Sequence, residues 1–248
     1  MSGPSEPPQR TDASPENLIH SQSADELIAV AGDLRLTEDL ALALLTRRDL
    51  PSEALEILNK NSALAKYRKV RLGIVTHPRT PRHVSIPVIR HLYTFELMQV
   101  ALLPAVAADI KRAAEEVLIG RLSTISSGER STLAKQSSGR VAAALLLDKE
   151  ERIMQAALNN PQMTEALLVK ALQSRQGTEL LVPAVCHHEK WSVRNEIKMA
   201  LLANENTPLA RALQFANELP VKELKEILLN SRLSSNVNSY LQTIVEKQ

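Results

Sequence analysis

The sequence predicts an all-α protein built as a right-handed α-solenoid of stacked short antiparallel helix pairs. The first observation is composition: the 248 residues include 39 leucines and 29 alanines but only 7 glycines and six aromatic residues. Leu and Ala are among the best helix formers, whereas strands are rich in aromatic and β-branched residues. The second observation is a twelve-residue pattern that recurs along the chain, and the third is the helix-start signal with which each copy ends.

The recurring pattern has an apolar stripe followed by a polar turn. Its first, fifth and sixth positions are apolar, as on one face of a helix, and its fourth is small, as close approach of a neighbouring helix requires. Four copies align without gaps and a fifth fits more loosely: LALALLTRRDLP (40–51), VRLGIVTHPRTP (70–81), IMQAALNNPQMT (153–164), IKMALLANENTP (197–208) and, loosely, LVPAVCHHEKWS (181–192).

The end of each copy predicts the start of another helix. Thr80-Pro81 and Thr207-Pro208 place a capping residue before a proline at the first helical position, where the missing N–H costs nothing. Pro51, Thr164 and Ser192 occupy the same place in the other copies. Further helices are expected at 105–122, 126–135 and 139–147, the second behind a Ser-x-x-Glu capping box that begins at 126.

Short helices joined by short turns, repeating every few tens of residues, indicate a solenoid of six or seven helix pairs. The spacing between copies is irregular, which leaves an ordinary globular helix bundle as the alternative. We expect a disordered N-terminal tail over 1–22 because it is rich in proline and poor in large apolar residues. A single α-helical repeat domain is expected over 23–248, beginning at the capping-box spacing of Ser23 and Glu26.

Several classes of protein are excluded by simple counts. A single cysteine, Cys186, rules out a disulfide framework, a cysteine-rich zinc site and an iron–sulfur cluster held by one chain. No apolar run approaches the roughly 18 residues of a membrane span, and the N-terminus lacks the apolar segment of a signal peptide. We therefore expect a cytoplasmic protein with no membrane span.

Three phrases carry a family resemblance, and together they fall within residues 37–217: VRLGIVTHPRTP, ALNNPQMTEALLVKAL and HHEKWSVRNEIKMALLANENTPLARAL. They resemble leucine-rich-repeat-variant and HEAT-like repeats, in which an apolar helix, an Asn/His-Pro-x-Thr-Pro turn and a short helix follow one another. The resemblance implies a two-layer helical solenoid used for protein binding. This chain departs from the family in its irregular period and in lacking a cysteine cluster ahead of the repeats, so no redox role carries over.

The charge is unevenly placed, although the net charge is only +2. Residues 57–95 contain no Asp or Glu and eight Lys or Arg, a distribution that attracts anionic partners. The alternative is that these cations pair with acids of adjacent repeats. The candidate binding residues on this basic face are Lys66, Arg68, Lys69, Arg71, Arg79, Arg82 and Arg90.

An anionic protein partner is favoured over nucleic acid. Tyr67 lies among the cations as one possible stacking ring, but two tyrosines and one phenylalanine in or beside the block are few for single-strand binding. The pI near 8.7 is also mild for a dedicated binder. A HEAT-like nucleic-acid-binding protein remains the alternative function. Trp191 is a weaker second candidate anchor for a partner, since Trp is enriched at interface hot spots, but a lone Trp at a turn more often packs beneath the next repeat.

The sequence offers little for catalysis or metal binding. His77, His83 and His91 lack nearby acids, and His77 occupies a turn position where it could satisfy a helix end. Cys186 takes an apolar position of the repeat, and adjacent His187 points about 100° away on a helix. No phosphate loop or nucleophile elbow occurs. We expect a non-enzymatic scaffold with no cofactor, no metal and no small-molecule substrate, and an enzyme is the third reading.

Overall fold

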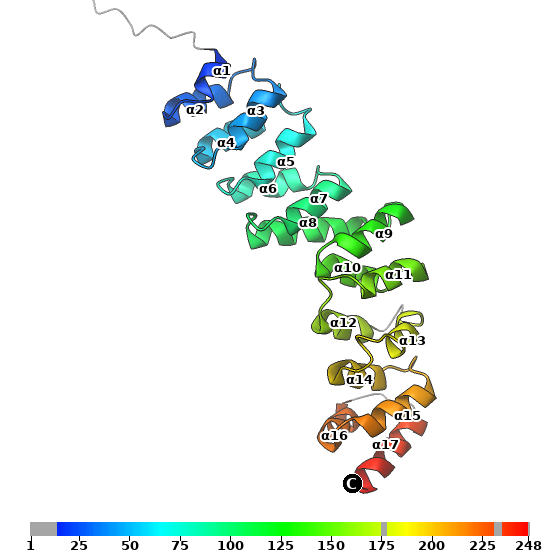
Figure 1. Cartoon of the computed structure of the whole chain (residues 1–248). Coiled ribbons are helices and arrows are strands. Elements are labelled where there is room, and N and C mark those ends of the chain that lie inside the picture. Colours follow the sequence, from blue (N-terminus) through cyan, green and yellow to red (C-terminus); the bar gives the residue numbers. More distant parts are fainter. Residues whose placement is uncertain (1–13, 175–177, 231–234, 248) are drawn as a thin grey trace, which may run out of the picture. The chain divides into compact units, whose positions relative to one another are not determined.

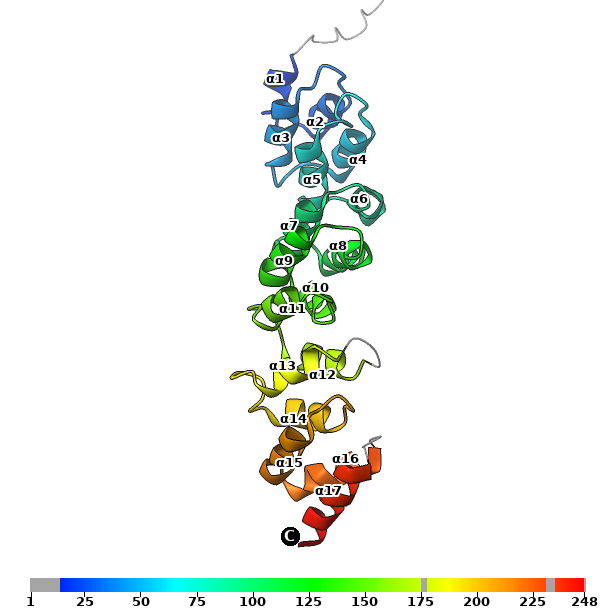
Figure 2. The same cartoon turned by 90° about the vertical axis from the view of Figure 1, so that its right-hand side faces the viewer.

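The computed structural model describes residues 14–174, 178–230 and 235–247 (Figures 1 and 2). All of the regular secondary structure in these ranges is α-helical, in 17 helices, so the predicted all-α class is confirmed. The chain divides into two compact units, Met1–Val117 and Leu118–Gln248, with the boundary inside one helix. None of the helices described is long and apolar enough to cross a membrane.

Unit 1 arranges its helices in two rows. In one row α3 packs on α5 and α5 on α7, and in the other α2 packs on α4 (Figures 1 and 2). α5 also packs on α4 and α6, which joins the rows. The helices are α1 Pro15–Leu18, α2 Ala24–Ala31, α3 Glu38–Leu45, α4 Ser52–Lys60, α5 Arg68–Thr76, α6 Arg82–Ile89, α7 Thr94–Leu102 and α8 Ala108–Arg121, which contains the boundary.

The core of unit 1 lies between these rows. Each helix contributes a short apolar stripe, such as Leu55 and Leu58 of α4 and Val70 and Ile74 of α5, all almost fully buried. The apolar repeat positions of α5, which include Val75, are therefore buried as predicted. Burying an apolar side chain of this size stabilises the fold by roughly 1.5–3 kcal/mol, so the shared stripe holds the short helices together.

Unit 2 repeats the two-row arrangement. α10 packs on α12, α12 on α14 and α14 on α16, while α9 packs on α11 and α15 on α17 in the other row. The helices are α9 Ser127–Gln136, α10 Gly139–Leu145, α11 Glu151–Leu158, α12 Glu165–Leu172, α13 Leu181–Cys186, α14 Asn195–Leu202, α15 Leu209–Glu218, α16 Val221–Asn230 and α17 Ser235–Lys247. The helices expected at 126–135 and 139–147 are confirmed as α9 and α10, and α8 fills the stretch expected at 105–122.

The predicted helix starts are confirmed more often than the predicted caps. Ser126 and Glu129 form the expected capping box of α9, with the Ser126 hydroxyl accepting from Glu129 N–H. α2 begins at Ala24 as expected, but the Ser23 side chain makes no capping bond. The Thr80 hydroxyl instead donates to the Ile74 carbonyl, 2.5 Å away, and thereby closes α5.

Thr207 acts in the same way as Thr80, because its hydroxyl donates to the Leu201 carbonyl at 2.5 Å. Pro81 and Pro208 take the N-cap positions themselves. The expected cap on α6 and α15 was therefore wrong in detail, although both helices start where the pattern placed them. A proline keeps the preceding residue out of helical geometry, which leaves each threonine hydroxyl beside the helix that has just ended.

The turns are tied to the preceding helix pair by one buried or half-buried side chain each. Asn160 Nδ2 donates to the Ala134 and Ser137 carbonyls, at 2.8 and 3.2 Å, while its Oδ1 accepts from Gln162 N–H at 2.7 Å. Asn61 bonds in the same way to Ala31 O, Asp33 O and the N–H of Ala63. We call these side chains turn clamps; they are Asn61, His77, Asn160, His188 and Asn204.

The N-terminal boundary differs from the one predicted. Residues 1–13 lie outside the described residues. Residues 14–22, expected as part of a disordered tail, contain α1 and the buried Ile19, which is only 6% exposed within the core of unit 1. Arg47 Nη1 also donates to the Ile19 carbonyl at 2.7 Å. One apolar side chain and one hydrogen bond thus fasten a segment whose composition alone suggested disorder.

Candidate interaction surface

The seven predicted cations of the basic face form two groups, one at each end of the α5–α6 helix pair. Arg68, Lys69 and Arg71 lie in the first turn of α5 behind Lys66, and Arg90 is the C-cap of α6. At the other end, Arg79 lies in the turn between the two helices and Arg82 begins α6. Because α5 has nine residues, its ends lie about 12 Å apart along the axis, so the basic block does not form one continuous patch.

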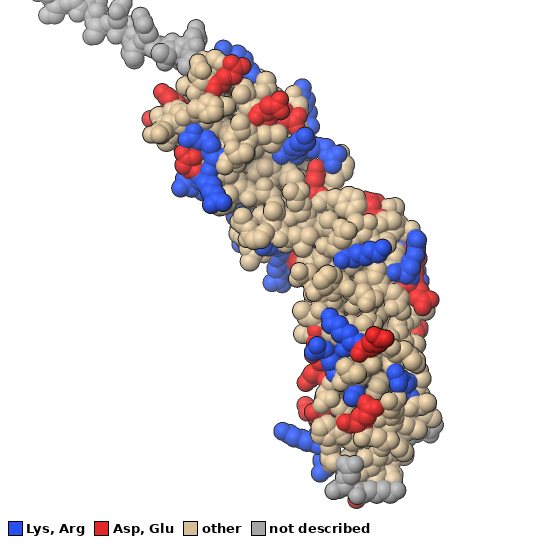
Figure 3. All heavy atoms as spheres, viewed as in Figure 1, with Lys and Arg blue, Asp and Glu red and all other residues tan. Residues whose placement is uncertain are grey.

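At the end with Arg79 and Arg82, both arginines already have partners in neighbouring segments. Arg82 forms an ion pair with Asp109 at 3.2 Å, and His83 Nε2 lies 3.4 Å from Glu56. Arg79 Nη1 donates to the Asp49 carbonyl at 2.9 Å. Acids one repeat away therefore meet Arg82 and His83, as the alternative reading of the basic block anticipated, while Arg79 is held by a main-chain carbonyl. On the face of unit 1 shown in Figure 3, basic and acidic side chains lie next to one another.

The end with Arg68 has a different character, because aromatic rings join the cations there. The Arg68 guanidinium lies 3.8 Å from the centre of the Tyr93 ring and forms an ion pair with Glu96 at 3.1 Å. Glu96 also accepts from the Tyr93 N–H at 2.8 Å, so one carboxylate holds both partners of the stack. Tyr93 and nearby Phe95 remain 56% and 46% exposed.

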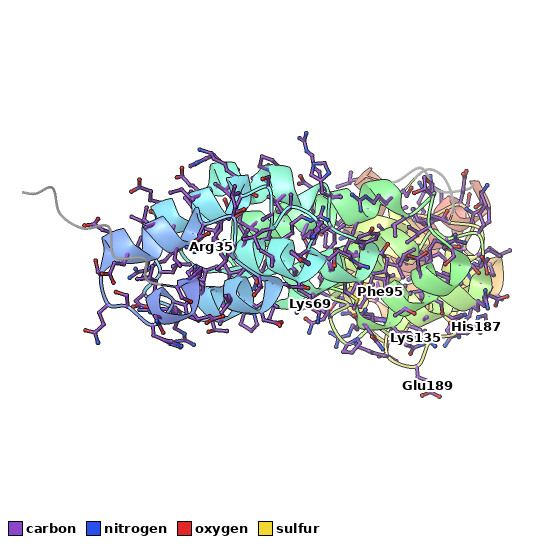
Figure 4. All side chains as sticks on the ribbon, turned by 90° about the horizontal axis from the view of Figure 1, so that it is seen from above. Arg35, Lys69, Phe95, Lys135, His187 and Glu189 are labelled. Atoms are coloured by element: carbon purple, nitrogen blue, oxygen red, sulfur yellow. The ribbon has the colours of Figure 1, made fainter. Side chains whose placement is uncertain are left out.

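Two lysines complete this surface. Lys66 and Lys69 are exposed, and neither has an ion-pair partner among the residues that the structure describes; Figure 4 labels Lys69 and Phe95 on unit 1. Lys66 Nζ lies 5.0 Å from the Tyr67 ring centre. We call this surface the cation–aromatic ridge; it consists of Lys66, Tyr67, Arg68, Lys69, Tyr93 and Phe95.

A hollow of about 250 Å³ opens beside the ridge, between the end of α4, the start of α5 and the end of α6. Its buried floor includes Leu64, Val70 and Val88, and its rim includes Ala65, Arg71 and His91. We call it the α5 hollow. An apolar floor with a cationic rim, next to exposed aromatic rings, is suited to binding a partner that is itself partly apolar and partly anionic.

Sequence reasoning missed Tyr93 and Phe95 as members of this surface. Both lie at the end of the acid-free block, 25 or more residues after Arg68, and nothing in a linear reading brings them next to Arg68. The available signal was their position: Tyr67 is the N-cap of α5 and Tyr93 is the N-cap of α7. Because these two helices pack side by side in one row, equivalent helix starts lie close in space.

Trp191, the second predicted anchor, packs inside unit 2. Its side chain is 1% exposed, and its indole N–H donates to the Leu158 carbonyl at 3.0 Å. Lys190 and Arg194 cover the ring, with the Lys190 Nζ 4.1 Å from its centre. Trp191 therefore packs beneath a neighbouring repeat. A ring enclosed in this way has no face left for a partner, so Trp191 is not the anchor that the sequence also offered.

The histidines of the basic block are separated by their roles. His77 Nε2 lies 2.8 Å from the Arg47 carbonyl, and its Nδ1 accepts from Arg79 N–H, so His77 satisfies a helix end as expected. His83 faces Glu56, and His91 lies on the rim of the α5 hollow. Over the described ranges, no group of three His, Cys, Asp or Glu lies close enough to hold a metal ion.

The Cys186-His187-His188 sequence has three different environments. Cys186 is fully buried, and Arg211 donates to its backbone carbonyl. His187 Nδ1 lies 2.9 Å from the Pro183 carbonyl, and Figure 4 labels this residue and Glu189 on unit 2. His188 Nε2 lies 3.3 Å from Asn159 Oδ1, and burial lowers the pKa of His188 below its usual value. These three side chains form no nucleophile–base pair.

The Cys186 thiol is expected to be unreactive while the protein is folded. Burial raises its pKa from 9.0 to about 11, which lowers the thiolate fraction at neutral pH by about 100-fold. Modification by a disulfide reagent at pH 7.5 should therefore be at least that much slower in native buffer than in guanidinium. As this is the single cysteine of the chain, the absorbance change reports on it alone. Rapid stoichiometric modification of the folded protein would contradict this expectation.

Comparison with protein-family models, with curated proteins and with solved structures gave no significant match. The leucine-rich-repeat-variant and HEAT-like likeness therefore stays a resemblance of the repeat phrases. The functional argument depends on the geometry of the cation–aromatic ridge and the α5 hollow.

Proposed function

We propose that this chain is a non-enzymatic interaction scaffold, a right-handed solenoid of HEAT-like helix pairs that binds an anionic protein partner through its basic face. The turn clamps support the stacked arrangement. Asn61, His77, Asn160 and Asn204 each reach a backbone carbonyl 23 to 32 residues earlier, which is about one helix pair along the chain. Such nearest-neighbour links are typical of repeat proteins.

The observation that carries the proposed function is the exposed cation–aromatic ridge. Trp191 and Phe215 are buried, whereas Tyr93 and Phe95 remain on the surface beside Arg68 and two lysines without acid partners among the described residues. Interface cores are enriched in aromatic residues and arginine, and complementary charge steers a partner toward them. The binding face thus consists of the ridge together with Arg71 and Arg90, and leaves out Arg79 and Arg82.

A nucleic-acid-binding role is the second candidate, and the stacked Arg68–Tyr93 pair is the observation that favours it. Single-stranded nucleic acids bind to basic grooves in which aromatic rings stack on successive bases. The ridge has three rings, and Tyr67 is half-buried. Binding of this kind would weaken steeply with salt because it releases counterions from the phosphates.

Reversal of the charge of the two ridge lysines is expected to weaken binding to an acidic chain strongly. Fluorescein-labelled poly-glutamate should bind the native protein at low salt, and Lys66→Glu with Lys69→Glu should weaken that binding about tenfold or more, since two attractions become repulsions. The matched control is Lys149→Glu with Lys222→Glu, which makes the same charge change at exposed residues of unit 2. Fluorescence anisotropy gives both affinities.

The same titration separates the two candidate functions. A single-stranded oligonucleotide of similar charge serves as the second probe. The native protein could bind the oligonucleotide more tightly than poly-glutamate at about 0.15 M salt and lose this binding in the ridge variant. That result would favour nucleic acid over protein as the partner. Equal loss of poly-glutamate binding in the ridge and control variants would show that only net charge matters, and would overturn the basic-face proposal.

A further inference from the structure

The α5 hollow has the size and lining to hold one apolar side chain. Its volume of about 250 Å³ exceeds the roughly 150 Å³ of an apolar cavity that accommodates benzene, and is below the range of about 300–1,000 Å³ usual for small-molecule sites. Leu64, Val70, Ile74 and Val88 give it an apolar floor, and each is 6% exposed or less. The hollow therefore fits a single leucine or phenylalanine side chain of a partner.

The rim of the hollow is positively charged and not neutralised by acids. Arg71 is half-buried, its Nε is buried without a hydrogen-bond partner, and no described residue forms an ion pair with it. A buried donor without a partner is unfavourable, so a guanidinium in this position gains from any carboxylate that gives it an acceptor. Lys60 and Lys66 lie on the chain segments that frame the same hollow, which is part of the acid-free block.

We propose that the α5 hollow binds one apolar side chain of an acidic peptide segment, and that Arg71 and the ridge lysines hold the carboxylates on either side of it. This inference rests on the proposed function and specifies its partner. The apolar floor supplies the affinity for the buried side chain, while the cationic rim selects against neutral or basic sequences around it.

A second hollow in unit 1 shows what distinguishes this one. It is larger, at about 520 Å³, and lies along α3 and α5 with Leu42, Leu45 and Ala105 in its lining. Each hollow has one arginine among its lining residues, Arg48 in the larger one and Arg71 in the α5 hollow. All lining residues of the α5 hollow lie within the acid-free block, whereas five of the nine that line the larger hollow lie outside it. Charge complementarity to an acidic segment therefore favours the α5 hollow.

The experiment compares two fluorescein-labelled acidic nonapeptides that differ only at the centre, one with leucine and the other with serine. The native protein is expected to bind the leucine peptide about tenfold more tightly. Ala65→Leu, which places a larger side chain at the exposed rim, should remove that preference and leave the serine peptide unaffected. Ala105→Leu is the matched control, since Ala105 is also an exposed loop alanine but lines the other hollow.

Arg71→Met tests the charged rim separately, because methionine keeps the apolar stem and removes the guanidinium. It should weaken both peptides by a similar factor and preserve the preference for leucine. If the leucine and serine peptides bind equally while charge reversal of the ridge lysines still weakens binding, the hollow proposal is overturned and the proposed function stands. If neither peptide nor poly-glutamate binds at low salt, both fail. Loss of the preference in Ala105→Leu rather than Ala65→Leu would place the apolar side chain in the other hollow and overturn this inference.

Discussion

Replacement of Gly139 by alanine is expected to destabilise unit 2 by about 3 kcal/mol, at the upper end of the usual cost of overpacking a core. Gly139 begins α10 and lies directly beneath the turn between α11 and α12. A Cβ atom at this position would lie 2.1 Å from the backbone oxygen of Gln162 and 3.1 Å from the Leu167 side chain. The oxygen belongs to the main chain and cannot rotate away, so the whole turn would have to move.

Chemical denaturation monitored by circular dichroism measures this effect as a lower midpoint at unchanged slope. Gly120→Ala is the matched control: Gly120 also lies in a helix, α8, but nothing lies within 4 Å of the position of its added Cβ. Alanine there should stabilise the protein by roughly 0.5–1 kcal/mol, because glycine loses more backbone freedom on folding. Equal midpoints for Gly139→Ala and the native protein would mean that α10 does not pack so closely on the turn.

Removal of the Asn160 side chain is expected to cost about 3 kcal/mol as well. The residue is 1% exposed, and alanine would leave the Ala134 and Ser137 carbonyls and the Gln162 N–H without their partner. Each buried polar group left unsatisfied costs about 1–3 kcal/mol. Thermal or denaturant unfolding measures the loss, with Asn195→Ala as the control, since Asn195 is exposed and also lies in unit 2.

Asn160→Asp distinguishes a hydrogen-bond role from simple volume. The aspartate keeps an acceptor for the Gln162 N–H, but its second oxygen faces the two carbonyl oxygens. Burial and repulsion from these oxygens disfavour the charged carboxylate and favour the neutral acid. The folded-state pKa of the new acid would then be raised above its unfolded value. The variant should lose stability as the pH rises above the unfolded pKa of about 4, relative to the native protein. A loss that does not change with pH would contradict the assigned bonds.

The repeat pattern predicted the helices well because it depends on local chemistry. Apolar positions at helical spacing placed Val70, Ile74 and Val75 in the core, and the turn position of His77 indicated a side chain that satisfies a helix end. The capping of α6 was wrong because the Thr80 hydroxyl had two helix ends within reach, and the sequence does not show which one it bonds. Similarly, the small fourth position fits Gly73, whose Cβ would lie 2.9 Å from Leu45, but Ala43 is exposed.

The candidate site was less predictable because its contacts cross from one repeat to the next. Arg68 meets Glu96 at a separation of 28 residues, and Arg82 meets Asp109 one repeat away in the same manner. A count of charges over 57–95 treats these cations as equivalent, whereas their partners lie just beyond that stretch. The Arg68–Tyr93 stack has the same origin. A reading that compares each cation with residues one repeat away would find both features.

The turn clamps have a consequence for how the chain comes together. Each clamp joins segments separated by about 30 residues, so the loop that must close before the bond forms is short, and closing it carries a small entropic penalty. Folding dominated by contacts between segments that are close in the sequence is rapid. During synthesis a newly made helix pair can thus dock on the helix pair made before it, without waiting for the rest of the polypeptide.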